Sequence, residues 1–408
     1  MIPESKALLK SYCIGIVWLL GLLWFLLGIG SDGTLSFGRT LRVWGYIFAF
    51  TAVVVTGVIL HKQGLLSWIG TPVSRVKGHA AAAAQKVPTW VWLVLIATAA
   101  AAFPFMTGRY GQDVAISVLV YICLGLGLNV VVGMAGMLDL GYIAFYGVGA
   151  YTYAILSVYY QISFWLCLPL AAGAACTAGC LIGYPTLRMR GDYLAIVTLG
   201  FGEIVRIIIN NWMQLTNGPN GILGIAAPSI YIPSFAQGFS FELVYLKKLQ
   251  YLYYVVLLLA VFTIIAVHRL NLSRIGRAWE AIREDETAAE LMGVNTYMLK
   301  LLAYAMGAIF AGLAGAFFAA RMRFVSPESF TFLESATVLA MVVLGGMASI
   351  PGIILGALAL IVLPEFFREF ELYRMAMLGA AMVLMMLFRP TGLIPATRMG
   401  SRSEEKEA

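Results

Sequence analysis

Long apolar stretches separated by short polar stretches run along nearly the whole chain. A run of about 20 apolar residues forms a helix long enough to cross a hydrocarbon layer about 30 Å thick. These runs are apolar on all sides, whereas strands of a membrane barrel alternate apolar and polar positions. The pattern therefore predicts an all-α, polytopic membrane helical bundle with about 10 to 12 transmembrane segments. The predicted helices cover residues 12–29, 41–60, 88–107, 113–132, 138–158, 164–185, 192–212, 249–268, 301–320, 331–347, 350–365 and 373–388.

Polar interruptions divide the chain into four parts. The first two predicted helices form an N-terminal extension over residues 1–60, whose first apolar run is longer than that of a usual signal peptide. Residues 61–87 combine basic residues with an alanine run, which indicates a cytoplasmic, partly amphipathic linker. The transmembrane domain follows over residues 88–395, and the last part is a charged cytoplasmic tail, 396–408. Two predicted helices of this domain, at 138–158 and 350–365, are also compatible with broken or re-entrant segments.

The charge distribution supports a membrane location and predicts the orientation. Of the 408 residues 61% are hydrophobic and 12% are charged, compared with about a quarter charged in soluble chains. The net charge of +7 comes from Lys and Arg at the ends of apolar runs, which is typical of topology signals rather than of a nucleic-acid surface. No Lys or Arg lies between Arg206 and Lys247. The sequence thus predicts a multi-pass inner-membrane protein with residues 61–87 and 269–300 in the cytoplasm and 213–247 outside.

Motifs for catalysis are missing from the sequence. No Gly-Lys dipeptide occurs, so the phosphate-binding loop GxxxxGK[ST] cannot form. The three histidines are scattered, and all five cysteines lie in apolar runs, where small packing residues are the favoured interpretation. Cys176 and Cys180 are one helical turn apart, which leaves a site between them conceivable. We expect no metal, no cofactor and no enzymatic activity, with ATP hydrolysis carried out by separate subunits.

The longest charged segment, residues 268–300, has five basic and five acidic residues between positions 269 and 300. Small or apolar residues alternate with these charges, so the segment is amphipathic and helix-forming. Such a helix suits a groove on another cytoplasmic protein. The alternative is a solvated loop between two membrane helices. The small and apolar positions are Ala281, Ile282, Ala288, Ala289, Leu291 and Met292.

Within this segment, TAAELMG at residues 287–293 resembles the EAAxxxG coupling motif of ABC importer permeases, with Thr287 where that motif has Glu. From about Val87 to Leu393 the chain resembles the LivM-type permease subunits of branched-chain amino acid ABC importers. The matching stretches include NVVVGMAGMLDLGYIAFYGVGAY at 129–151, LRMRGDYLAIVTLGFGEIVR at 187–206, TNGPNGI at 216–222, SRIGRAWEAIREDETAAELMGVN at 273–295, MVVLGGMASIPG at 341–352 and LFRPTGLIP at 387–395.

The resemblance implies the fold of the larger ABC importer permeases and transport of leucine, isoleucine and valine. It also implies a LivH-type partner permease, two ABC ATPase subunits, a periplasmic amino acid binding protein and surrounding membrane lipids, and no nucleic acid. The coupling residues it implies are Glu286, Thr287, Ala288, Ala289 and Gly293, of which Gly293 is expected in the left-handed conformation that ends a docking helix.

Two other functions stay open from the sequence. One is a related permease that carries other amino acids, urea or amides. An ion-coupled secondary transporter working alone would use intramembrane carboxylates, for which Asp139, Glu203 and Glu334 are the candidates.

Polar and glycine residues inside the predicted helices are candidates for the translocation pathway. Glu203 and Arg206 are three residues apart and predict an ion pair inside the bundle, with a role in a gate as the alternative. The glycine-rich stretch at 125–149 favours close helix packing, and a broken helix near 133–141 is the alternative. The turn-rich loop 213–247 either receives a binding protein or is a plain external loop. The candidate pathway residues are Asn129, Gly133, Gly136, Asp139, Thr198 and Glu203.

Overall fold

The structure is a computed structural model that describes residues 98, 100–187, 189, 191–234, 240–246, 248–366, 379, 383 and 392–394. The predicted helices at 12–29 and 41–60, most of those at 88–107 and 373–388, the linker and the tail lie outside the described residues. The total of 10 to 12 crossings therefore stays a prediction.

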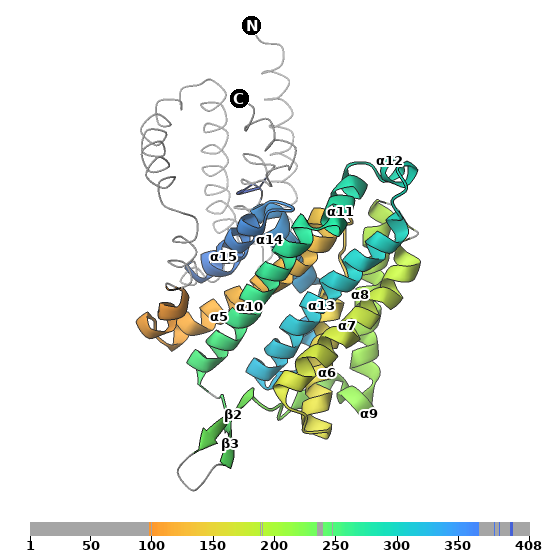
Figure 1. The fold of residues 1–408 in the computed structure, drawn as a ribbon. Helices are drawn as coiled ribbons and strands as arrows, with labels where there is room; N and C mark the ends of the chain where they lie inside the picture. The colour runs from red at the N-terminus through yellow and green to blue at the C-terminus, as the bar shows by residue number, and fades with distance from the viewer. Residues whose placement is uncertain are drawn as a thin grey trace, which may run out of the picture. The chain divides into compact units, whose positions relative to one another are not determined.

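Apolar helices make up the described bundle and confirm the all-α fold class (Figure 1). Six helical segments in this part are long and apolar enough to cross a membrane, and two shorter apolar helices accompany them. Each lies where an apolar run predicts it. The helices are α5 (Arg109–Asn129), α6 (Ile143–Tyr159), α7 (Phe164–Thr186), α8 (Asp192–Asn211), α10 (Leu249–Leu272), α13 (Thr296–Met322), α14 (Phe332–Gly345) and α15 (Ile350–Phe366).

Helix α13 lies at the centre of this bundle and packs against α5, α6 and α7. Its contact with α6 depends on glycine, because a Cβ added to Gly149 would lie 2.3 Å from the carbonyl oxygen of Gly312. A Cβ on Gly315 would similarly lie 2.1 Å from the carbonyl oxygen of Tyr146. Small residues at these positions bring the two backbones into contact, as in other membrane helix pairs. The close-packing interpretation of the glycine-rich stretch thus applies to Gly149.

The same stretch also contains a helix break. After α5 the chain forms a five-residue π-helix, η1 (Val130–Met134), and then runs without a regular helix until α6 begins at Ile143. The predicted helix at 138–158 therefore starts too early. The break near residues 133–141, which the sequence left as the alternative to packing, is present together with close packing.

Short elements connect the helices at the two ends of the bundle. At one end lie α9 (Met213–Thr216), the 3-10 helices η2 (Gly218–Asn220) and η3 (Pro327–Phe330), and the antiparallel pair β1 (Ile222–Leu223) with β4 (Phe324–Val325). A hairpin of β2 (Ser229–Ser234) and β3 (Ser240–Tyr245) lies in the same loop region. The opposite end carries α11 (Arg274–Glu284) and α12 (Glu286–Leu291) (Figure 1).

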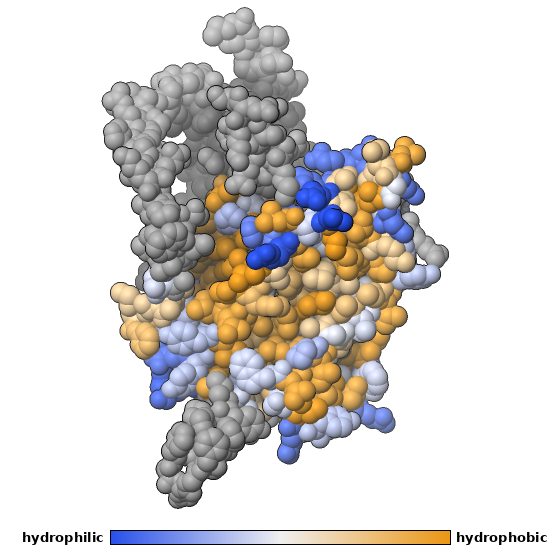
Figure 2. Space-filling model, in the orientation of Figure 1, coloured by the Kyte–Doolittle hydropathy of each residue, from blue (hydrophilic) through white to orange (hydrophobic). Residues whose placement is uncertain are grey.

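The outer surface agrees with a membrane-embedded bundle. Figure 2 shows a broad hydrophobic surface across the middle of the visible face, with hydrophilic residues near α11 and α12 and at the other end. Leu258, Phe262 and Ile265 of α10 are among its exposed apolar side chains. Apolar side chains are stable in this position when lipid replaces water around the helices.

Candidate functional site

The α11–α12 hairpin, residues 273–294, is defined by helix caps that the sequence encodes locally. The Ser273 hydroxyl accepts a hydrogen bond from the Gly276 amide at 3.2 Å and begins α11. The Asp285 carboxylate accepts hydrogen bonds from the amides of Thr287 at 2.8 Å and Ala288 at 3.0 Å. Because Asp285 has extended backbone angles, it ends one helix and caps the next. The amphipathic segment therefore forms two short helices.

Gly293 ends α12 in the way the sequence predicts. Its φ is +87°, in the left-handed region that glycine adopts without penalty. The Gly293 amide donates to the Glu290 carbonyl at 2.9 Å, and the Val294 amide donates to the Ala289 carbonyl at 3.1 Å. These two bonds form a Schellman motif, which satisfies the last carbonyl groups of the helix.

The expected coupling residues divide into a buried and an exposed set. Ala289 is buried within its own chain, so it supports α12 rather than contacting a partner. Thr287 and Ala288 are exposed. Leu291 and Met292 are apolar and strongly exposed, with 84% of each residue accessible. The hairpin thus presents an apolar tip at the end of a short, capped helix.

The hairpin is attached to the membrane helices by buried contacts. Trp279 is fully buried, and its indole N–H donates to the Leu299 carbonyl oxygen at 2.8 Å. Lys300 of α13 pairs with Glu286 of α12 at 2.6 Å, and the Lys300 side chain is only 10% exposed. These contacts hold both hairpin helices against the start of α13.

A second group of candidate residues lies at the π-helix. The Asn129 side-chain oxygen accepts a hydrogen bond from the Ala348 amide at 2.8 Å, and Asn129 is fully buried. A Cβ on Gly133 would lie 1.9 Å from that oxygen, so glycine leaves room for the bond. Gly136 has a left-handed φ of +72° directly beside Arg283 of α11. Three predicted pathway residues therefore lie together at the end of α5.

Asp139 and Thr198 form a third group, in which they fix the connection between η1 and α6. The Gly141 amide donates to Asp139 at 2.9 Å, and the Leu140 amide donates to the Thr198 hydroxyl at 3.1 Å. Both side chains are buried and tie α8 to the helix break.

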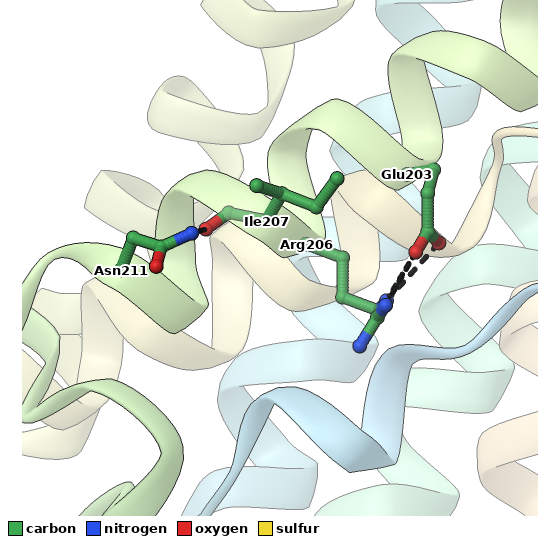
Figure 3. Close-up of polar contacts among 4 residues, drawn as sticks. All are labelled: Glu203, Arg206, Ile207 and Asn211. Atoms are coloured by element: carbon green, nitrogen blue, oxygen red, sulfur yellow. Dashed lines mark hydrogen bonds and ion pairs between the residues drawn. The ribbon is translucent and has the colours of Figure 1, made fainter.

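Glu203 and Arg206 form the predicted ion pair on α8 (Figure 3). The Arg206 Nε atom donates to the two Glu203 carboxylate oxygens at 2.9 and 3.0 Å. Their side chains are 40% and 30% exposed, respectively, so the pair is half-buried in this chain, and its position inside the bundle stays a prediction. The neighbouring Ile204 and Ile207 on α8 are exposed, so the pair lies at the edge of an exposed face of this helix.

Two polar contacts near the other end of the bundle were not predicted as pairs. The Tyr121 hydroxyl donates to Glu334 at 2.6 Å, so this carboxylate bridges α5 and α14. Arg321 of α13 pairs with Asp113 of α5 at 2.6 Å. Both contacts join residues more than 200 positions apart.

In the part of the chain that the structure describes, no group of side chains is a candidate metal site. Within it, no three His, Cys, Asp or Glu side chains gather closely enough to hold an ion. Cys176 and Cys180 on α7 are free thiols, and so are the other described cysteines, Cys123 on α5 and Cys167 on α7.

Comparisons with known proteins agree with the sequence motifs. Residues 112–386 match the family described as branched-chain amino acid transport system / permease component. The chain is 47% identical over 370 residues to the high-affinity branched-chain amino acid transport system permease protein LivM of Escherichia coli K12, covering 87% of this chain and 86% of that protein. Its identity to the LivM protein of Salmonella typhimurium is also 47%, with the same coverage.

More distant similarity extends to a second kind of permease. The chain is 26% identical over 290 residues to the permease protein LivH of Escherichia coli K12, covering 67% of this chain and 91% of that protein. No solved structure gives a significant match.

Proposed function

Because this chain belongs to the permease family of branched-chain amino acid transport systems, we propose that it is the LivM-type permease subunit of an ABC importer for leucine, isoleucine and valine. It is a multi-pass membrane protein, and its place in this proposal is the inner membrane of a bacterium. The chain itself makes no covalent change to the substrate. Separate ATPase subunits supply the energy.

The observation that carries this proposal is the capped hairpin with its exposed tip. Leu291 and Met292 give an apolar surface that suits a groove on an ATPase, and the whole of the six-residue helix α12 fits in such a groove. Acidic residues surround the tip, at Asp285 and Glu290 among others, so a matching groove would carry basic residues beside apolar ones. Two such ATPases would serve this chain and a second permease of the LivH type.

In this proposal the substrate passes along the interface between the two permeases. The helix break at 133–141 and the neighbouring pathway candidates supply polar backbone and side-chain groups within an apolar bundle. Irregular backbone at membrane depth is tolerated where protein or a water-filled path surrounds it. A periplasmic amino acid binding protein would deliver substrate to the external loops near 213–247.

Reconstitution of the complete importer tests the function. The chain, its partner permease and both ATPases are placed in proteoliposomes with the binding protein, and uptake of radiolabelled leucine, isoleucine and valine is measured with ATP. Urea, amides and other amino acids serve as competitors. We expect saturable uptake of the three branched-chain substrates that stops when ATP is omitted.

The same preparation separates the alternative functions. An ion-coupled transporter would move substrate without the ATPases and would lose activity when ionophores collapse the ion gradients. A binding and competition pattern that favours urea or amides would replace the substrate assignment while leaving the importer assignment intact. ATP turnover by this purified chain alone would contradict the division of labour between permease and ATPase.

A further inference from the structure

Arg283, near the end of α11, reaches from the hairpin to the π-helix that follows α5. Its Nη1 atom donates to the carbonyl oxygen of Gly133 at 2.6 Å. The last carbonyl groups of a helix have no partner within the helix, and the negative end of the helix dipole lies there. A guanidinium group satisfies such a carbonyl and is attracted to this dipole. The contact joins residues 150 positions apart.

The chain after the π-helix also packs closely on the aliphatic part of Arg283. A Cβ placed on Gly136 would lie 2.9 Å from the Cγ atom of Arg283 and 3.3 Å from its Cα. Only a residue without a side chain fits at this distance, and the left-handed φ of Gly136 turns the chain around the arginine. Arg283 is therefore held by a hydrogen bond on one side and by packing on the other.

From the π-helix the contacts continue to the connection between α14 and α15. Asn129 immediately precedes η1, and its oxygen accepts the hydrogen bond from Ala348. Gly133 lies between these groups, because an added Cβ would be 1.9 Å from the Asn129 oxygen and 2.6 Å from the Ala348 nitrogen. A shift of the Gly133 peptide must therefore displace the bond between Asn129 and Ala348.

A π-helix is suited to such a shift. It contains one more residue per hydrogen-bonded turn than an α-helix and occurs mostly as single turns, often at functional sites. Conversion between the two hydrogen-bond patterns gives the segment two discrete arrangements, which is what a coupling element requires. The Gly133 carbonyl held by Arg283 belongs to this turn.

We propose that Arg283 is a positioning residue that ties the α11–α12 hairpin to η1, so that movement of α12 shifts the π-helix and, through Asn129, the α14–α15 connection. This inference rests on the proposed function, in which ATPases move α12. Movement of α12 reaches Arg283 because Asp285 is the only residue between the two short helices. The alternative is a purely structural cap, which would affect stability without changing transport per ATP.

The first test measures movement directly and does not depend on the substrate. Met347, next to Ala348, is 41% exposed, and Met347→Cys in a background with the five native cysteines replaced by alanine gives one labelling site. Its alkylation rate is measured in the assembled importer with and without ATP. We expect ATP to change the rate. An unchanged rate would overturn the proposal.

The second step places Arg283→Met in this labelled complex, with Arg277→Met on the same helix as the matched control. Both arginines are exposed residues of α11, so each replacement removes one positive charge from this helix, and Arg283 is the one that donates to Gly133. We expect Arg283→Met to abolish the ATP-dependent change in labelling and Arg277→Met to retain it. Equal behaviour of the two variants would show that Arg283 has no special role.

The third measurement is the amount of leucine transported per ATP hydrolysed. Loss of a charge-assisted hydrogen bond in the coupling element should lower this ratio about tenfold in Arg283→Met, with ATPase recovery maintained. A parallel loss of ATPase activity and transport, at constant ratio, would indicate a structural cap and contradict the proposal. If wild-type importer moves no leucine but the labelling results hold, the substrate assignment fails and the link through Arg283 stands.

Gly136→Ala decides the question if Arg283→Met does not assemble. It retains the guanidinium group, but its methyl group would press on the Arg283 side chain and strain the backbone. We expect the same loss of ATP-dependent labelling at Met347→Cys. Wild-type labelling and a wild-type transport ratio in the Gly136→Ala complex would overturn the proposal.

Discussion

Replacement of Gly293 by aspartate should uncouple transport while leaving the membrane bundle intact. Gly293 has the left-handed φ of the Schellman turn, and a Cβ built there meets no atom within 4 Å. The substitution therefore causes no collision, and its cost comes from the backbone conformation and from charge. An ordinary side chain in the left-handed region costs about 1 kcal/mol, and aspartate tolerates this region better than most residues.

Charge adds to the backbone effect. A carboxylate at the C-terminal end of a helix opposes the dipole by about 0.3 to 1 kcal/mol. Position 293 is also close to Glu290, so the new carboxylate lies beside a like charge on the hairpin. Together the two effects amount to about 1 to 2 kcal/mol, which corresponds to roughly a 5- to 30-fold fall in the docking-competent population.

The assay compares three variants in membranes and in purified complexes. Gly293→Asn has the shape of aspartate without its charge, and Gly293→Ala tests the backbone cost alone. We expect normal amounts of all three proteins in the membrane, with leucine uptake and ATPase recovery reduced least by asparagine and most by aspartate. Wild-type uptake and ATPase recovery in Gly293→Asp would refute a coupling role for this turn. Equal losses in the asparagine and aspartate variants would refute the charge contribution.

Three further outcomes follow from the described contacts. Asp285→Ala should lower the amount of ATPase that co-purifies with the permease, because losing an N-cap costs about 1 kcal/mol. Asp285→Asn keeps a capping oxygen and should co-purify the normal amount of ATPase. Trp279→Phe removes the indole N–H that donates to the Leu299 carbonyl and should destabilise the complex by about 0.5 to 1.5 kcal/mol. This is measured as a lower thermal unfolding midpoint, and an unchanged midpoint would contradict it. Glu203→Gln and Arg206→Gln each leave one charge in a membrane helix without its partner, so the double variant should be present in membranes in a larger amount than either single variant. The amounts are measured by immunoblotting, and equal amounts of the three variants would contradict this expectation.

The helix positions could be predicted because membrane helices are long apolar runs, but several boundaries were placed too far inside. The helix predicted to begin at residue 113 begins at Arg109, and the one predicted to begin at 301 begins at Thr296. In both cases a charged residue that the prediction left outside, Arg109 or Lys300, belongs to the helix. Asp113 pairs with Arg321, and Lys300 pairs with Glu286, so each charge is compensated by a partner on another element.

In the candidate site, features that depend on neighbouring residues could be predicted from the sequence, and features that depend on distant residues could not. Gly293 could be predicted because a left-handed helix end depends on a few neighbouring residues, and the pairing of Glu203 with Arg206 could be predicted because they are one turn apart. The exposure of that pair depends on which neighbours cover α8, which spacing along one helix does not determine. Arg283 was not among the candidates, because its partner is a backbone carbonyl 150 residues away, and any residue type presents the same carbonyl. The signal that remains in the sequence is indirect: Gly133 and Gly136 lack side chains where Asn129 and Arg283 approach the backbone most closely.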